Sequence, residues 1–310
     1  MKKNNNAGTS SLTREYLTVL LEHRSIVALC CCVLTLMLSF YGIIAGVIRT
    51  ITILEEDGFV SFIYFTMLSN TFAAISMAFI FPYTVEGIRK KRFTLPKWVA
   101  VIHYMATTSI AIMFIFVLAF MSWASPENAF GGPNLVTHIF CPILILTSFF
   151  QMEHGYIYSW KDRLLGILPF FIYLVVYTIE TTVIGETRGG WPDIYQIKAH
   201  LSPALAVPVL LLFAFCISTA ISLFSNFLTK KRKKKMFRYW NENLDPVEVK
   251  IEAYAMGRMA GQYGEKNNIQ IPYDILMDLA ARYHVETEDL MKAFVKGFLT
   301  EFKERKLFSN

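Results

Sequence analysis

The sequence has few charged residues and lacks the motifs that mark many soluble enzymes. Asp, Glu, Lys and Arg make up 17% of its 310 residues, whereas soluble globular domains carry about 25%. We find no phosphate-binding glycine loop, no HExxH zinc motif and no GxSxG nucleophile elbow. The five cysteines form neither a disulfide framework nor a zinc-ligand spacing. These absences argue against a soluble enzyme and predict neither a metal nor a cofactor.

Long runs of apolar residues make up much of the sequence. Hydrophobic residues make up 54% of the chain, and a helix needs ~20 of them in succession, at ~1.5 Å each, to cross a bilayer. Six stretches meet this requirement: 26–48, 59–82, 98–123, 135–154, 164–185 and 203–228. The pattern therefore predicts an all-α, polytopic membrane protein, with residues 26–228 forming a six-helix transmembrane bundle among membrane lipids.

The basic residues indicate how this bundle is oriented. Segment 1–25, the second and fourth connections and the stretch after residue 228 hold most of the Lys and Arg outside the apolar runs. Because loops rich in Lys and Arg stay in the cytoplasm, we expect a multi-pass protein of the cell membrane with both termini cytoplasmic. The net charge of +6 then reflects topology, and no nucleic-acid partner is expected.

Residues 229–310 are predicted to form a basic linker followed by a small helical cytoplasmic tail. Asp245 and Pro246 are typical of a helix start, Pro272 of a second, and a third is expected from about Glu286 to Glu304. The third helix has a stripe of apolar residues at four-residue steps: Leu290, Phe294, Phe298 and Phe302. Such a stripe packs inside the tail or against a protein partner, so residues 246–305 are the candidate partner-binding segment.

The consecutive cysteines 30–32 lie near the expected cytoplasmic end of the first run. Cysteines at such a position can be palmitoylated. They can equally be packing residues, because free cysteine is readily buried. The sequence leaves both interpretations open.

Ionisable residues inside apolar runs are costly and mark candidate sites. They are His103, His138, Glu153, His154 and Glu180. Glu153 and His154 can reach the headgroups, and a packing role suffices for His103. His138 lies one turn below the outer surface, and Glu180 lies ~24 Å along the fifth run, also in its outer third.

Thr66 and Asn70 in the second run occupy an overlapping range of depth, one turn apart on one helix face. A threonine hydroxyl becomes a nucleophile when a nearby base such as His138 takes its proton. Asn70 could donate to a developing oxyanion, and Glu180 could orient the imidazole. The alternative is structural, because Thr often bonds its own i−4 carbonyl and Asn or His often joins helices.

These residues lie in segments that resemble a known family. The stretch FTMLSN at 65–70 resembles the threonine-bearing segment of the androgen-induced family of multi-pass membrane proteins and of a related bacterial group. The stretch NLVTHIFCP at 134–142 resembles its second motif, a histidine followed four residues later by proline. GGWPDIY at 189–195 resembles its aromatic–proline stretch. The resemblance covers roughly residues 26–228.

The resemblance implies a threonine hydrolase that acts on lipid acyl esters, with Thr66 as the nucleophile and His138 as the base. A lipid ester substrate would enter from the outer leaflet. Two other functions remain open: a transporter or small-molecule-binding protein whose path includes Glu180, His138 and His200, and a scaffold or sensor that binds a partner through its tail.

Overall fold

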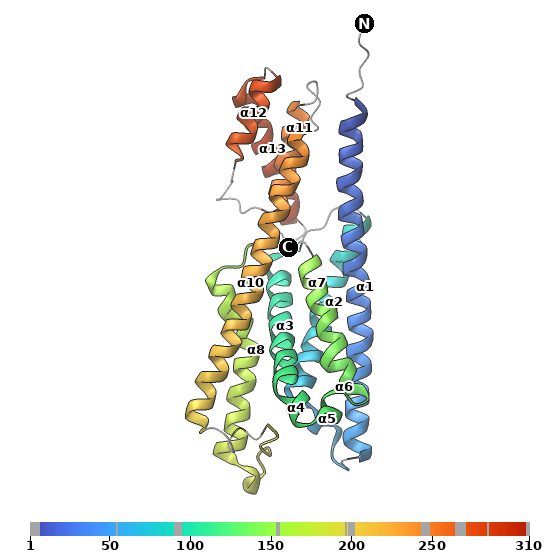
Figure 1. Ribbon diagram of the computed structural model, residues 1–310, viewed down its shortest axis with the longest axis vertical. Coiled ribbons are helices and arrows are strands. Elements are labelled where there is room, and N and C mark those ends of the chain that lie inside the picture. Colours follow the sequence, from blue (N-terminus) through green and yellow to red (C-terminus); the bar gives the residue numbers. More distant parts are fainter. Residues whose placement is uncertain are drawn as a thin grey trace.

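The structure is a computed structural model that describes residues 7–53, 55–89, 95–152, 156–195, 197, 202–242, 249–263, 271–283 and 285–307. Within these ranges the chain forms helices and short connections and contains no strand (Figure 1). The predicted all-α architecture is therefore confirmed.

Six helices are long and apolar enough to cross a membrane, as expected for a multi-pass membrane protein. These spans are Ile26–Thr52, Phe65–Glu86, Lys97–Met121, Pro133–Gln151, Trp160–Ile184 and Pro203–Lys231. Each closes its backbone hydrogen bonds within itself, which is what a helix needs in lipid. The predicted runs agree with the spans to within a few residues, except that the second begins six residues later, at Phe65.

The spans belong to elements that alternate in direction along the bundle (Figure 1). The elements are α1 (Ala7–Ile53), η1 (Gly58–Ile63), α2 (Phe65–Arg89), α3 (Lys97–Phe116), α4 (Ser122–Ala124), α5 (Pro126–Phe130), α6 (Pro133–Leu135), α7 (Cys141–Gln151), α8 (Trp160–Thr178), η5 (Glu186–Arg188) and α10 (Pro203–Glu242). We call the end of the bundle that holds α4, α5, α6 and the start of α2 the distal end, because it lies farthest from the tail.

Three of the spans widen into π turns at the distal end. They are η2 (Val117–Met121), η3 (Val136–Phe140) and η4 (Ile179–Ile184). The turn in η3 has a local cause, because Pro142 has no N–H for the carbonyl of His138 and its ring crowds that carbonyl. A π turn makes room at such a position, and π turns are frequent at functional sites.

The structure adds detail to two predictions about the ends of the bundle. The basic stretch after residue 228 is helical, because α10 continues without a break to Glu242; Lys and Arg are good helix formers. Of the cysteines at 30–32, Cys31 and Cys32 are buried and the Sγ of Cys32 donates to the Met77 carbonyl at 3.2 Å. Cys30 is the exposed member of the three.

The tail forms a small core of its own from α11 (Val249–Tyr263), α12 (Tyr273–Tyr283) and α13 (Thr287–Leu307). The predicted start at Asp245 and Pro246 lies outside the described residues. Leu290, Phe294 and Phe298 of the predicted stripe are buried, so most of the stripe is used inside the tail. A protein partner would have to bind another surface, and Tyr273 and Met277 of α12 are among the exposed apolar side chains.

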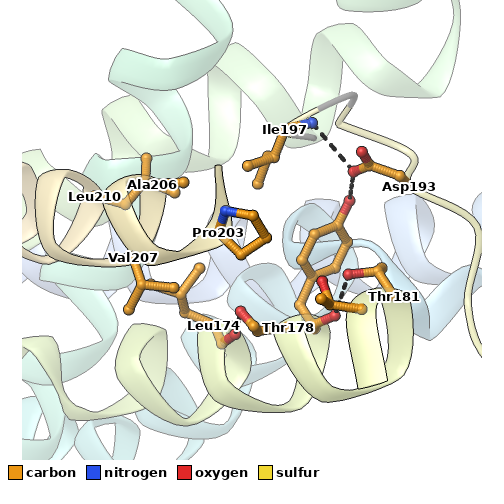
Figure 2. Close-up of a pocket in the computed structure, with 11 residues that line it drawn as sticks. Leu174, Thr178, Thr181, Asp193, Ile197, Pro203, Ala206, Val207 and Leu210 are labelled. Atoms are coloured by element: carbon orange, nitrogen blue, oxygen red, sulfur yellow. Dashed lines mark hydrogen bonds between the residues drawn. The ribbon is translucent and has the colours of Figure 1, made fainter. Parts of the chain in front are cut away.

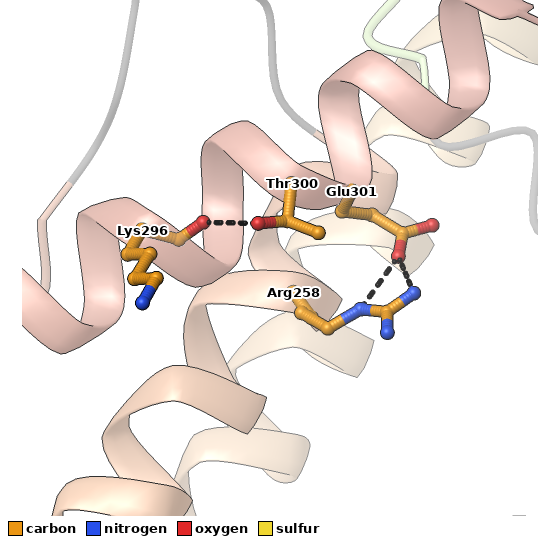
Figure 3. Close-up of polar contacts among 4 residues, drawn as sticks. All are labelled: Arg258, Lys296, Thr300 and Glu301. Atoms are coloured by element: carbon orange, nitrogen blue, oxygen red, sulfur yellow. Dashed lines mark hydrogen bonds and ion pairs between the residues drawn. The ribbon is translucent and has the colours of Figure 1, made fainter.

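Close helix contact and one ion pair join α11 to α13. A Cβ added to Gly257 would lie 1.8 Å from the Phe294 carbonyl oxygen, so the backbones meet where only glycine fits. Beyond this contact, the guanidinium of Arg258 donates from Nε and Nη2 to one carboxylate oxygen of Glu301, at 3.1 and 2.9 Å (Figure 3). The Glu301 side chain is 1% exposed, so this ion pair holds a buried carboxylate.

Candidate active site

Thr66 and His138, which lie 72 residues apart in the sequence, meet at the distal end. Thr66 lies in the first turn of α2, and His138 lies in the π turn η3 of the fourth span. The Thr66 Oγ1 atom is 3.3 Å from the His138 Nε2 atom, at the long end of the hydrogen-bond range. Thr66 is partly exposed and His138 is buried. A nucleophile candidate and a base candidate are thus within reach of each other.

The hydroxyl of Thr66 has a different hydrogen-bond partner from the hydroxyls of several other threonines in the described helices. Thr71, Thr84, Thr178 and Thr181 each donate to the carbonyl four residues earlier, at 2.7–2.8 Å, the usual arrangement for threonine in a helix. Thr66 cannot do so within α2, because that helix begins at Phe65. Its hydroxyl hydrogen is therefore available to His138.

The other ring nitrogen of His138 fixes the direction of this hydrogen bond. His138 Nδ1 lies 2.7 Å from the carbonyl oxygen of Ala129, and a carbonyl oxygen can only accept. The proton of the neutral imidazole is therefore on Nδ1, and Nε2 presents its lone pair to the Thr66 hydroxyl. This is the arrangement that a general base needs, with a backbone carbonyl where hydrolase triads place a carboxylate.

A short helix and a glycine turn hold that carbonyl in place. Ala129 is fully buried near the end of α5. The chain then reverses through Gly132, whose φ of 54° and ψ of −128° suit glycine because it has no Cβ. Ala129 was not predicted from the sequence, since its contribution is a backbone group; the Gly131–Gly132–Pro133 turn was the one available signal.

Asn70 joins the two elements of the site but does not point its amide hydrogens at it. Its Nδ2 donates to the carbonyl of Thr66 at 2.8 Å and to the carbonyl of Thr137 at 3.3 Å. Both N–H groups are thereby used, so the predicted donation to an oxyanion is not available in this structure. Asn70 instead ties the first turn of α2 to the residue that precedes His138.

A free backbone N–H at the start of α2 could take over that role. The hydroxyl of Tyr195, in the loop before the last span, accepts from the Phe65 N–H at 2.9 Å. Burial raises the pKa of Tyr195, so this hydroxyl stays protonated. The next N–H, of Thr66 itself, has no acceptor among the described residues. Unpaired N–H groups at a helix N-terminus attract negative charge.

Glu180 does not join this group in the structure. It lies at the distal end, as its depth predicted, but on η4, and no described hydrogen bond links it to Thr66 or His138. The position that sequence analysis gave it, on the second imidazole nitrogen, is occupied by the Ala129 carbonyl. Glu153, His154 and His200 lie outside the described residues.

A crevice lies beside η4, and it is too small to hold a solute. It lies between α8 and α10 and includes Asp193, which accepts from the Tyr177 hydroxyl at 2.6 Å and the Ile197 N–H at 3.1 Å (Figure 2). Its volume is about 10 Å³, which is close to the minimum for one water molecule. Nothing larger fits there, so this crevice gives no support to a substrate path through the fifth and sixth spans.

A larger and mostly apolar groove lies beside the first turns of α2. It has a volume of about 180 Å³ and lies between α2, α3 and α8, where its lining includes Phe65, Leu68, Phe72, Ile172 and Val176. Leu68, Ile172 and Val176 are exposed on the surface that faces lipid in a membrane. The groove therefore opens sideways, and Phe65, the residue before Thr66, is part of its lining.

No three His, Cys, Asp or Glu side chains gather into a possible metal site in the described part of the chain. Comparisons of the chain with protein-family models, with curated proteins and with solved structures find no match.

Proposed function

We propose that the protein is an intramembrane threonine hydrolase that cleaves acyl esters of lipids. The observation that carries the proposal is the hydrogen-bond chain from the Thr66 hydroxyl to Nε2 of His138 and from Nδ1 of His138 to the Ala129 carbonyl. This chain gives a weak nucleophile a base of fixed tautomer. The resemblance of residues 65–70 and 134–142 to the androgen-induced family supports the same residues in the same roles.

The first half-reaction follows from these contacts. The Thr66 Oγ1 attacks the ester carbonyl carbon while Nε2 of His138 takes the hydroxyl proton. Negative charge develops on the carbonyl oxygen, and the free N–H of Thr66 at the start of α2 stabilises it together with the helix dipole. The C–O bond to the alcohol then breaks, and His138 returns the proton to the departing oxygen. An acyl group remains on Thr66.

The apolar groove beside α2 supports a lipid as the substrate. An acyl chain would enter from the bilayer past Leu68 and Ile172 and lie against Phe65 and Phe72. Its ester end would lie at the end of the groove formed by Phe65, the residue before Thr66. Burying each methylene contributes about 0.8 kcal/mol relative to water, so long-chain esters gain binding energy that short ones lack.

The proposal includes an orientation in which the distal end lies in the outer leaflet of the cell membrane. The excess of Lys and Arg at the opposite end, including Lys230 and Lys231, supports cytoplasmic termini. Protease added to intact cells should then leave the tail uncut. Cleavage of the tail without membrane permeabilisation would reverse the orientation.

Ester hydrolysis by the purified protein tests the proposal. We expect the protein in lipid nanodiscs to release fatty acid from long-chain esters, and kcat/KM to fall as the acyl chain is shortened below the length of the groove. A matched preparation of His138→Gln should lose this activity, because glutamine cannot accept the proton. Hydrolysis that persists in His138→Gln at the wild-type rate would refute the proposal.

We call Thr66 and His138 the dyad. A glycine on α1 offers a test of the geometry of the dyad from a neighbouring helix. A Cβ on Gly42 would lie 2.3 Å from the Thr137 methyl group, next to His138. Gly42→Ala should therefore shift η3, and a shift of about 1 Å can lower a rate by up to ~10²-fold. Gly46→Ala, one turn along the same helix, meets the flexible end of Met67 and serves as the matched control. Equal rates for the two variants would contradict this expectation.

A further inference from the structure

The amide of Asn70 is only half satisfied by the protein. The side chain is fully buried, and its two N–H groups bond the carbonyls of Thr66 and Thr137. Its Oδ1 atom accepts from no donor among the described residues. A buried acceptor left without a partner costs about 1–3 kcal/mol. Because Oδ1 can only accept, the missing partner must be a donor.

Hydrogen bonds of the Asn70 amide connect it to the segments that hold Thr66 and His138. Asn70 lies one turn, ~6 Å, beyond Thr66 on α2, and it is bonded to the residue that precedes His138. The Asn70 amide is thus bonded to the backbone of Thr66 and to that of the residue before His138, which places its Oδ1 in the same part of the bundle as both. The full burial of Asn70 excludes a bulky substrate group there, whereas a water molecule needs little space and makes several hydrogen bonds.

We propose that Oδ1 of Asn70 holds the water molecule that hydrolyses the acyl-Thr66 intermediate, an inference that rests on the proposed function. The water oxygen attacks the acyl carbonyl carbon while Nε2 of His138 takes a water proton. The bond from that carbon to Thr66 Oγ1 then breaks, and His138 returns the proton to Oγ1. The fatty acid leaves and Thr66 is restored. Asn70 positions the nucleophile of the second half-reaction and touches neither bond of the first.

The interior of the bundle offers further places for water. Hydroxyls on α1, α2 and α3 are fully buried and have no hydrogen-bond partner among the described residues: Thr35, Ser76 and Thr107. Buried polar groups of this kind are the usual hosts of internal water.

Pre-steady-state kinetics of a matched pair of variants tests this assignment. Valine and threonine have the same shape, but only threonine has an oxygen. The full-length protein in nanodiscs is mixed with a long-chain p-nitrophenyl ester; the burst of nitrophenol reports acylation, and intact-protein mass spectrometry reports the acyl-enzyme. Asn70→Val and Asn70→Thr both lose the amide bonds to the carbonyls of Thr66 and Thr137, so we expect acylation to slow to a similar extent in the two variants. In Asn70→Val we expect deacylation to fall by about tenfold or more beyond that loss, with accumulation of acyl-Thr66. Asn70→Thr should recover deacylation in part.

The controls separate this inference from the proposed function. Ser76→Ala removes another buried, unpartnered oxygen from α2 and should deacylate normally. A parallel fall of both steps in Asn70→Val, or equal deacylation in the Val and Thr variants, would mean that Asn70 only braces the two helices, and would overturn the inference. Absence of acyl-Thr66 from both the wild type and Asn70→Val, under conditions in which the wild type hydrolyses the ester, would overturn the proposed function itself. Should Asn70→Val not fold, the smaller pair Asn70→Ala and Asn70→Ser makes the same comparison.

Discussion

Replacing Thr66 with alanine is expected to lower ester hydrolysis by about 10³-fold or more and to abolish labelling by a fluorophosphonate. The loss is large because the nucleophile and its base act as a unit, so removing one removes the contribution of both. Labelling requires the Thr66 Oγ1 to attack phosphorus and displace fluoride while His138 takes the proton. Alanine offers no such oxygen. The rate with a long-chain ester and in-gel detection of the probe measure the two effects.

The matched control is Thr71→Ala, on the same helix. The Thr71 hydroxyl bonds the carbonyl of Met67 in its own helix, at 2.8 Å, so its removal should leave both labelling and rate near the wild-type values. Thermal unfolding should change little in either variant, because Thr66 is partly exposed and alanine is a good helix former. Full labelling of Thr66→Ala would exclude Thr66 as the nucleophile.

The second large effect is expected in the tail. Arg258→Met should lower the local stability of α11 and α13 by about 3 kcal/mol, because it removes the guanidinium that donates to the buried carboxylate of Glu301. We place the effect at the lower end of the range for buried pairs because the Arg258 side chain is 34% exposed. Native-state hydrogen exchange of the amides in the full-length protein measures this free energy of opening.

A second ion pair between the same two helices gives the comparison. Lys250 bonds Asp289 and holds the pKa of that carboxyl below its usual value, but both side chains are exposed, at 57% and 38%. Lys250→Met should therefore change stability much less than Arg258→Met, because an exposed ion pair is screened by solvent. Replacing both Arg258 with Met and Glu301 with Gln should restore most of the stability lost in the single variant. Equal losses in Arg258→Met and Lys250→Met would contradict the role given to burial.

The architecture could be predicted because a membrane imposes a simple rule. Each span must be apolar over ~20 residues and helical throughout, and both properties are legible in residues such as those at 98–123 and 203–228. Hydropathy does not report where a helix begins, however. The second run was expected to be helical from residue 59, whereas α2 starts at Phe65. This difference matters for Thr66, because it moves that residue from the interior of a helix to its N-terminus.

Thr66 and His138 could be predicted as a pair because depth and residue type are enough to bring them to one level. The roles of Asn70 and Glu180 could not, because a role depends on which way each side chain faces. Rotation about the helix axis is set by packing, and π turns such as η3 and η4 shift it further. The Ala129 carbonyl and the Thr66 N–H carry no side-chain signal at all, since every residue but proline has both backbone groups.

The most direct measurement is the location of the covalent adduct after the wild-type protein has reacted with a fluorophosphonate or a slow ester substrate. Digestion and tandem mass spectrometry would identify the modified residue. We predict a single modification on the peptide that contains residues 65–70, with fragment ions that place it on Thr66 and not on Ser69. An adduct on any other side chain, or no adduct under conditions in which the protein hydrolyses the ester, would contradict a threonine nucleophile activated by His138.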